Sequence, residues 1–123
     1  MSKKLLVVAL GVLSCASVMA QSQGDWVLAR WKSGTFWFPG VVQARNGDQI
    51  TIAYDDGTRE TLPAKLVKPY DWAIGSRVEC RWQGGNMWYQ GKITGVSRNR
   101  TMIDVLYDDG DRERIATGGC RSR

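Results

Sequence analysis

The chain has 123 residues, of which 43% are hydrophobic, and a formal net charge of +5. It contains no histidine, the commonest general base and metal ligand in proteins, and this argues against an enzyme. The positive excess is small, whereas nucleic-acid binders usually cluster basic residues on one face. We therefore expect a non-enzymatic protein with no cofactor and no metal.

Residues 1–20 are typical of a cleaved signal peptide. Two lysines precede an apolar run over residues 5–13, and residues 18–20 fit the small-x-small pattern for cleavage before Gln21. The run is too short for a membrane-spanning helix, which needs about 20 residues. The pattern predicts export to a periplasm or beyond, and a mature chain without a transmembrane segment.

A second processing route stays open at the same end. The run Val12-Leu13-Ser14-Cys15 loosely resembles a bacterial lipobox. Cleavage there would place a lipid on Cys15 and the protein at an outer membrane. Otherwise Cys15 is an ordinary signal-peptide residue.

The rest of the chain repeats itself. Residues 24–42 match residues 75–93, and the acidic segment 54–60 reappears at 107–113. Such self-similarity indicates two copies of one structural unit, which we place at residues 24–70 and 75–123. A unit of about 50 residues buries too little surface to be very stable alone, so we expect the two copies to pack together.

The first repeat has the pattern of short strands. Over residues 26–31, Val27, Ala29 and Trp31 alternate with Leu28 and Arg30, which predicts a half-buried strand. Turn signals at Asn46-Gly47 and Asp56-Gly57 divide the remainder of the repeat. We expect further strands at residues 36–44, 49–54, 59–62 and 66–67.

The second repeat has the same plan, with a longer turn around residues 97–100. Its strands are expected at residues 78–82, 87–95, 102–107 and 112–115. Four or five short antiparallel strands per repeat predict an all-β fold in which each repeat is a strongly bent sheet that closes into a small barrel. The connection carries Tyr70, Trp72 and Ile74, so we expect the barrels to touch.

Two cysteines lie beyond the predicted signal peptide. Cys80 lies on the first strand of the second repeat and Cys120 near its closing strand, and these strands are neighbours in a small barrel. An exported protein can hold a disulfide between them. The alternative is one buried thiol and one thiol in a loose tail.

Aromatic residues recur at matched places in both repeats. Each first strand ends in tryptophan, each second strand has an aromatic pair, and each third strand ends in tyrosine before an acidic turn. Rings from three strand ends could wall a pocket that attracts a cation, with Asp56 or Asp109 at its edge. Alternatively, the rings fill the core. The acidic pairs fit hairpin turns better than a calcium site.

These residues resemble a Tudor domain or the related Agenet domain. The matching runs are Val27–Trp31, Phe38–Val42 and Ile52–Gly57, then Cys80–Trp82, Trp88–Ile93 and Val105–Gly110. The resemblance implies two tandem five-stranded SH3-like barrels, each with an aromatic cage for methylated lysine or arginine in a partner protein. The implied cages are Trp31, Phe38, Tyr54 and Asp56 in the first repeat, and Trp82, Tyr89, Tyr107 and Asp109 in the second.

The family's fourth cage aromatic is missing after each acidic turn, where Arg59 or Arg112 could occupy the gap. We predict a tandem Tudor-like module that binds a protein or peptide segment. One alternative is a nucleic-acid binder with stacked aromatics, whose phosphate contacts would come from Arg98, Arg100, Arg121 and Arg123. Another is a structural envelope protein or a wall-glycan attachment module.

Overall fold

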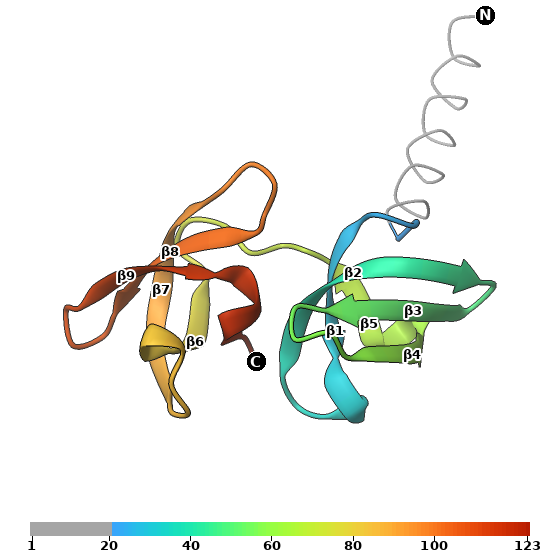
Figure 1. Ribbon diagram of the computed structural model, residues 1–123, viewed down its shortest axis with the longest axis horizontal. Coiled ribbons are helices and arrows are strands. Elements are labelled where there is room, and N and C mark those ends of the chain that lie inside the picture. Colours follow the sequence, from blue (N-terminus) through green and yellow to red (C-terminus); the bar gives the residue numbers. More distant parts are fainter. Residues whose placement is uncertain (1–20) are drawn as a thin grey trace, which may run out of the picture.

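The computed structural model describes residues 21–123, so the predicted signal peptide and Cys15 lie outside the described residues. Two five-stranded antiparallel sheets lie side by side along the long axis of the molecule, and each is strongly curled (Figure 1). The predicted all-β fold of two tandem barrels is confirmed. Within residues 21–123, no helix has the length and apolar character needed to cross a membrane.

The first sheet has the strand order β4-β3-β2-β1-β5, so that β1 lies between the long strand β2 and the closing strand β5. Its strands are β1 (Trp26–Arg30), β2 (Trp37–Asn46), β3 (Gln49–Tyr54), β4 (Arg59–Pro63) and β5 (Val67–Pro69). Short 3-10 turns come after β1 and β4, at η1 (Trp31–Ser33) and η2 (Ala64–Leu66).

The second sheet repeats this topology in the order β10-β6-β7-β8-β9. Its strands are β6 (Arg77–Arg81), β7 (Trp88–Val96), β8 (Met102–Tyr107), β9 (Arg112–Ala116) and β10 (Cys120–Arg121). The matching 3-10 turns are η3 (Trp82–Gly84) and η4 (Thr117–Gly119). The rim tryptophans Trp31 and Trp82 therefore begin a turn and do not end the strand.

Each long strand bends at a bulge, which helps a five-stranded sheet curl on itself. The register shifts between Val42 and Ala44 in β2, and at the equivalent place in β7. Gly40 lies where β2 passes close to β3, and a Cβ there would come within 2.5 Å of Ile52 Cγ2. Glycine at this position permits the close approach of the two strands.

Each sheet encloses its own apolar core. The first core is formed by Val27, Ala29, Val42, Ile50, Ile52, Leu62 and Val67. The second is formed largely by residues of repeat two, including Val78, Ile93, Ile103, Val105 and Ile115, and extends to Leu28, Tyr70 and Trp72. Burial of these side chains is the main source of stability in so small a fold.

The predicted half-buried pattern of residues 26–31 is wrong at Leu28. Val27, Leu28 and Ala29 are all completely buried, so β1 is covered on both faces. Leu28 lies in the second core because repeat two packs on the outer face of β1. The alternation of apolar and polar residues along a strand predicts only one buried face. The other face of β1 is buried by the second repeat.

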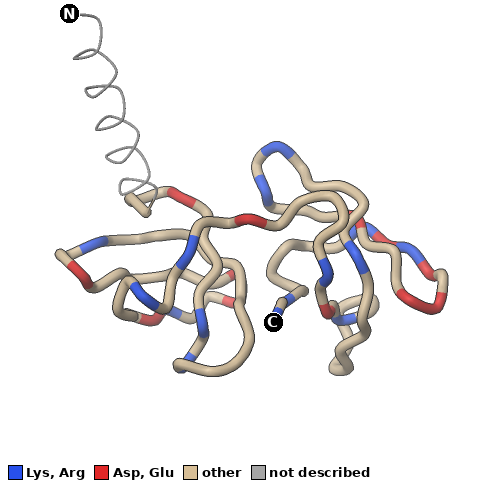
Figure 2. The backbone as a smooth tube through the Cα atoms, turned by 180° about the vertical axis from the view of Figure 1, so that it is seen from behind, with Lys and Arg blue, Asp and Glu red and all other residues tan. Residues whose placement is uncertain are grey.

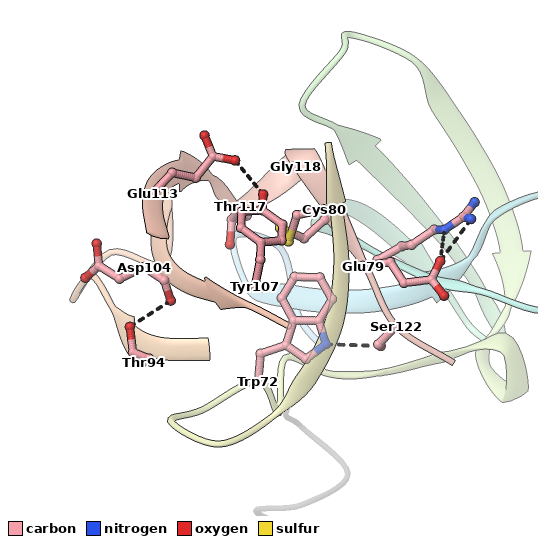
Figure 3. Close-up of a disulfide and its surroundings, with 12 residues drawn as sticks. Trp72, Glu79, Cys80, Thr94, Asp104, Tyr107, Glu113, Thr117, Gly118 and Ser122 are labelled. Carbon is pink, nitrogen blue, oxygen red and sulfur yellow. Dashed lines mark hydrogen bonds and ion pairs between the residues drawn. A yellow bond between two sulfur atoms is a disulfide. The ribbon is translucent and has the colours of Figure 1, made fainter. Parts of the chain in front are cut away.

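A seam joins the two repeats, and the closing segment (residues 117–122) makes much of it. Ser122 exchanges backbone hydrogen bonds of 2.7 and 3.0 Å with Trp37 of the first repeat. The indole Nε1 of Trp72 donates to Ser122 Oγ at 3.1 Å (Figure 3). The Thr117 and Tyr70 hydroxyls are hydrogen-bonded at 2.8 Å. The predicted contact between the barrels is thus present.

A disulfide between Cys80 and Cys120 holds the closing segment to β6. Both cysteines are completely buried, and the bond lies beside Thr117 and Tyr107 (Figure 3). The connection between the repeats is buried at Tyr70 and Trp72, whereas Ile74 is 77% exposed. Ile74 therefore contributes little to the seam.

Candidate functional site

The four residues implied for the first repeat surround one cavity of about 260 Å³, which we name the first-repeat hollow. They are Trp31, Phe38, Tyr54 and Asp56. The rings of Trp31 and Phe38 meet edge to face with centroids 6.1 Å apart. Trp31 is 42% exposed, so it stands at the rim of the hollow and does not fill the core.

The four residues implied for the second repeat surround a larger cavity of about 410 Å³, the second-repeat hollow. Tyr107 is buried, and its ring contacts Trp82 at 5.7 Å and Tyr89 at 6.5 Å, both edge to face. Tyr89 is 46% exposed, and Asp109 also lines the cavity. The residues come together as predicted, and ligand binding by them stays a prediction.

In the first repeat, Glu60 on β4 fixes the turn that carries the rim tryptophan. Its carboxylate accepts a 2.9 Å hydrogen bond from the Tyr54 hydroxyl and a 2.8 Å bond from the backbone N–H of Lys32. Lys32 comes directly after Trp31 and has a φ of 52°, a left-handed conformation that is uncommon outside glycine. The carboxylate thus links the hollow's tyrosine to the turn that positions its tryptophan.

Glu113 on β9 makes the same contacts in the second repeat. It accepts hydrogen bonds from the Tyr107 hydroxyl and from the backbone N–H of Gln83, the residue after Trp82 (Figure 3 shows the tyrosine bond). Neither glutamate was predicted as a site residue. The signal was present, because the segment that recurs at 107–113 ends in glutamate in both copies.

Three buried or partly buried tyrosines predict an alkaline transition. Burial first, and then the hydrogen bond to the neighbouring glutamate, raises the pKa of Tyr54 and of Tyr107 well above the usual value of about 10. Burial also raises the pKa of Tyr70. Unfolded tyrosines lose their protons first, so the unfolded state binds fewer protons above about pH 10 and stability falls as pH rises.

We expect these three tyrosines to ionise together with unfolding in an alkaline titration followed by phenolate absorbance and circular dichroism. A Tyr107→Phe variant should remove one phenolate from that step. If all tyrosines ionise while the circular dichroism stays native, the three hydroxyls are not shielded from water as the structure places them.

The acidic turns differ between the repeats. In the first, Asp56 Oδ1 accepts hydrogen bonds from the Thr58 hydroxyl at 2.7 Å and its backbone N–H at 3.0 Å. These bonds hold the pKa of the Asp56 carboxyl below its usual value. Asp111 stands where Thr58 does, and Asp109 Oδ1 accepts only the Asp111 backbone N–H, at 3.0 Å. The second turn therefore presents an additional carboxylate, which lines the hollow.

The third carboxylate of the second turn is already paired. Asp108 accepts two hydrogen bonds from the Arg77 guanidinium, at 2.9 and 2.8 Å. This pairing lowers the pKa of Asp108 and raises the pKa of Arg77. Asp108 is consequently less available to a ligand than Asp109 and Asp111.

Residues of the second repeat enter the first-repeat hollow, which local patterns did not predict. Trp88 lines it and meets Phe38 edge to face at 6.2 Å. The guanidinium carbons of Arg81 and Arg121 lie 4.6 and 4.0 Å from the Trp88 ring centroid. The arginines that line this hollow therefore come from repeat two, and Arg59 is not among the lining residues.

The four arginines suggested for nucleic-acid contacts do not form one basic face. Arg98 and Arg100 lie in the loop between β7 and β8, seen as the blue loop at the top of Figure 2. Arg121 and Arg123 instead contact Glu79, at 3.0 and 3.7 Å. Glu79 thus neutralises part of the charge that a phosphate backbone would need.

No protein-family model matches the chain, and no curated protein does so in sequence. Its structure is similar to that of the Crb2 tandem tudor domains, with a TM-score of 0.61 and 15% identity over 83% of this chain and 79% of that chain. The fold is that of tandem Tudor domains. At this identity the likeness establishes the fold and leaves the ligand open.

Two further modules are also similar, at lower TM-scores of 0.38. One is AGD34 of Arabidopsis thaliana AGDP1, 16% identical over 89% of this chain and 86% of that chain. The other is ADCP1 tandem Agenet domain 3-4, 17% identical over 89% and 84%.

Proposed function

We propose that the protein is an exported, non-enzymatic tandem Tudor-like module that binds a protein or peptide segment through its aromatic hollows. The ligand group is a methylated or otherwise cationic side chain. One observation carries the proposal: Trp82, Tyr89 and Tyr107 wall an open hollow that carboxylates also line. Each aromatic face attracts a cation by about 0.5–2 kcal/mol, and a nearby carboxylate adds to this.

Export is supported by the signal-peptide pattern of residues 1–20 and by the Cys80–Cys120 disulfide. Disulfides persist in oxidising compartments and are rare in the cytosol. We therefore place the module in a periplasm or outside the cell, where its partner would be an envelope or extracellular protein.

The rim tryptophans give the direct test. Trp82→Ala or Trp31→Ala, whichever removes a ring from the hollow that binds, should weaken capture of cationic peptides by about 2- to 30-fold on an array carrying lysine, arginine and their methylated forms. Met87→Ala is the matched control, because Met87 is 64% exposed but lines neither hollow. Circular dichroism should stay native in all three variants.

Normal capture by both tryptophan variants would show that the hollows do not bind these side chains. Equal losses in the tryptophan variants and in Met87→Ala would show the same, because the effect would then not depend on the hollows.

A further inference from the structure

The two hollows differ in charge although the repeats share one plan. The second-repeat hollow is lined by Asp108, Asp109 and Asp111, and no lysine or arginine is among its described lining residues. The first-repeat hollow is lined by Arg81 and Arg121. Figure 2 shows the acidic turn at the outer end of the second repeat, away from the first. The two hollows therefore cannot be equivalent sites for a cation.

The first-repeat hollow belongs to the seam. Trp88, a second-repeat ring, already has the guanidinium groups of Arg81 and Arg121 against it. Asp55 Oδ2 accepts the Gly118 N–H at 2.9 Å, and Asp56 is hydrogen-bonded to Thr58. An entering cation would meet two like charges and carboxylates that already have partners, which disfavours binding.

The second-repeat hollow keeps its acceptors. Asp109 accepts one backbone N–H through Oδ1. Within residues 21–123, the Asp111 carboxylate has no hydrogen-bond or ion-pair partner. Asp109 and Asp111 thus line the same cavity as Trp82 and Tyr89.

Aromatic walls with free carboxylate acceptors favour one class of cation. A guanidinium is planar, stacks on rings, and carries five N–H donors that can bind carboxylates in pairs. A quaternary ammonium can lie against the rings but has no N–H, so it would leave the carboxylates without hydrogen bonds while displacing their water. In this hollow the charge of a guanidinium would interact with the aromatic faces, and its N–H groups would donate to the carboxylates.

Building on the proposed function, we propose that the second-repeat hollow binds an arginine side chain of the partner in preference to a quaternary ammonium such as trimethyllysine. Asp111 is the residue that sets this preference. The first repeat shows the alternative chemistry at the same position, since Thr58 there satisfies Asp56 internally.

The experiment is an NMR titration of the protein with end-blocked pentapeptides, glycine at four positions and arginine or trimethyllysine at the centre. The indole N–H signals of Trp82 and Trp31 report on the two hollows separately. We expect the arginine peptide to shift Trp82 and not Trp31, and to bind about fivefold or more tightly than the trimethyllysine peptide.

Asp111→Thr copies the turn of the first repeat and should therefore keep the fold. It should weaken arginine binding about fivefold and change trimethyllysine binding less than twofold. The reverse variant, Thr58→Asp, should not create arginine binding at Trp31, because Arg81 and Arg121 remain. Unchanged backbone amide signals away from each turn establish that both variants are folded.

The outcomes separate the two proposals. If trimethyllysine shifts Trp82 as strongly as arginine, or if Asp111→Thr weakens both peptides equally, the guanidinium preference is wrong and the cation-binding function stands. If neither peptide shifts Trp82 or Trp31, both proposals are wrong. If arginine shifts Trp31 instead, the assignment of the site to the second repeat is wrong.

Discussion

Removal of the Cys80–Cys120 disulfide should lower the free energy of unfolding by about 4 kcal/mol. The bond joins residues 40 positions apart, and a cross-link over such a loop restricts the unfolded chain strongly. It also holds the closing segment, whose Ser122 and Thr117 contact the first repeat. The measurement is urea unfolding of the oxidised protein against Cys80→Ala/Cys120→Ala.

The loss should extend beyond the second repeat. Trp37 and Trp72 both contact Ser122, so their fluorescence should change before global unfolding when the disulfide is absent. Treatment of the double variant with a reductant serves as the control and should have no further effect. An unchanged unfolding midpoint in the double variant would contradict the role we give the bond.

Leu28→Ala should destabilise the protein by about 3 kcal/mol, although Leu28 lies outside the core of its own repeat. Leu28 is completely buried, among residues that include Tyr70, Trp72 and Val78, and truncation would leave a cavity in the seam. Because the seam couples the two repeats, we also expect a broader unfolding transition. Calorimetry and urea unfolding measure both effects.

Lys65→Ala is the control for Leu28→Ala, because Lys65 is exposed, and it should change stability by less than about 0.5 kcal/mol. A loss below about 1 kcal/mol for Leu28→Ala would mean that the second repeat does not cover β1. A single sharp transition would mean that the repeats are coupled elsewhere.

The fold was predictable because the strands carry local signals. Alternating side chains at Ile50 and Ile52, the Asn46-Gly47 turn and the duplication itself specify a bent antiparallel sheet twice over. The rim residues were predictable from the same source, since strand ends on one edge of a barrel lie together. The role of the glutamates that fix the tryptophan turns was not predictable in this way. Each glutamate contacts a turn far away in the sequence, so its role depends on how the strands are arranged in the sheet.

The contacts between repeats could not be read from periodicity. Trp88 occupies the hollow of the other repeat, and Leu28 is buried by a surface far away in the sequence. A comparison of the copies held a clue, because Leu28 aligns with Glu79. A leucine in one copy and a carboxylate in the other indicates that this outer strand face packs against the other repeat in only one of them.

This difference disfavours a third unit joined through the contact that joins the first two. A third copy added through the contact that joins the first two would have to bury Glu79, which instead pairs with Arg121 on β10. Removing that carboxylate from its arginine would be costly. An array extended through this same contact would therefore require an apolar residue at position 79.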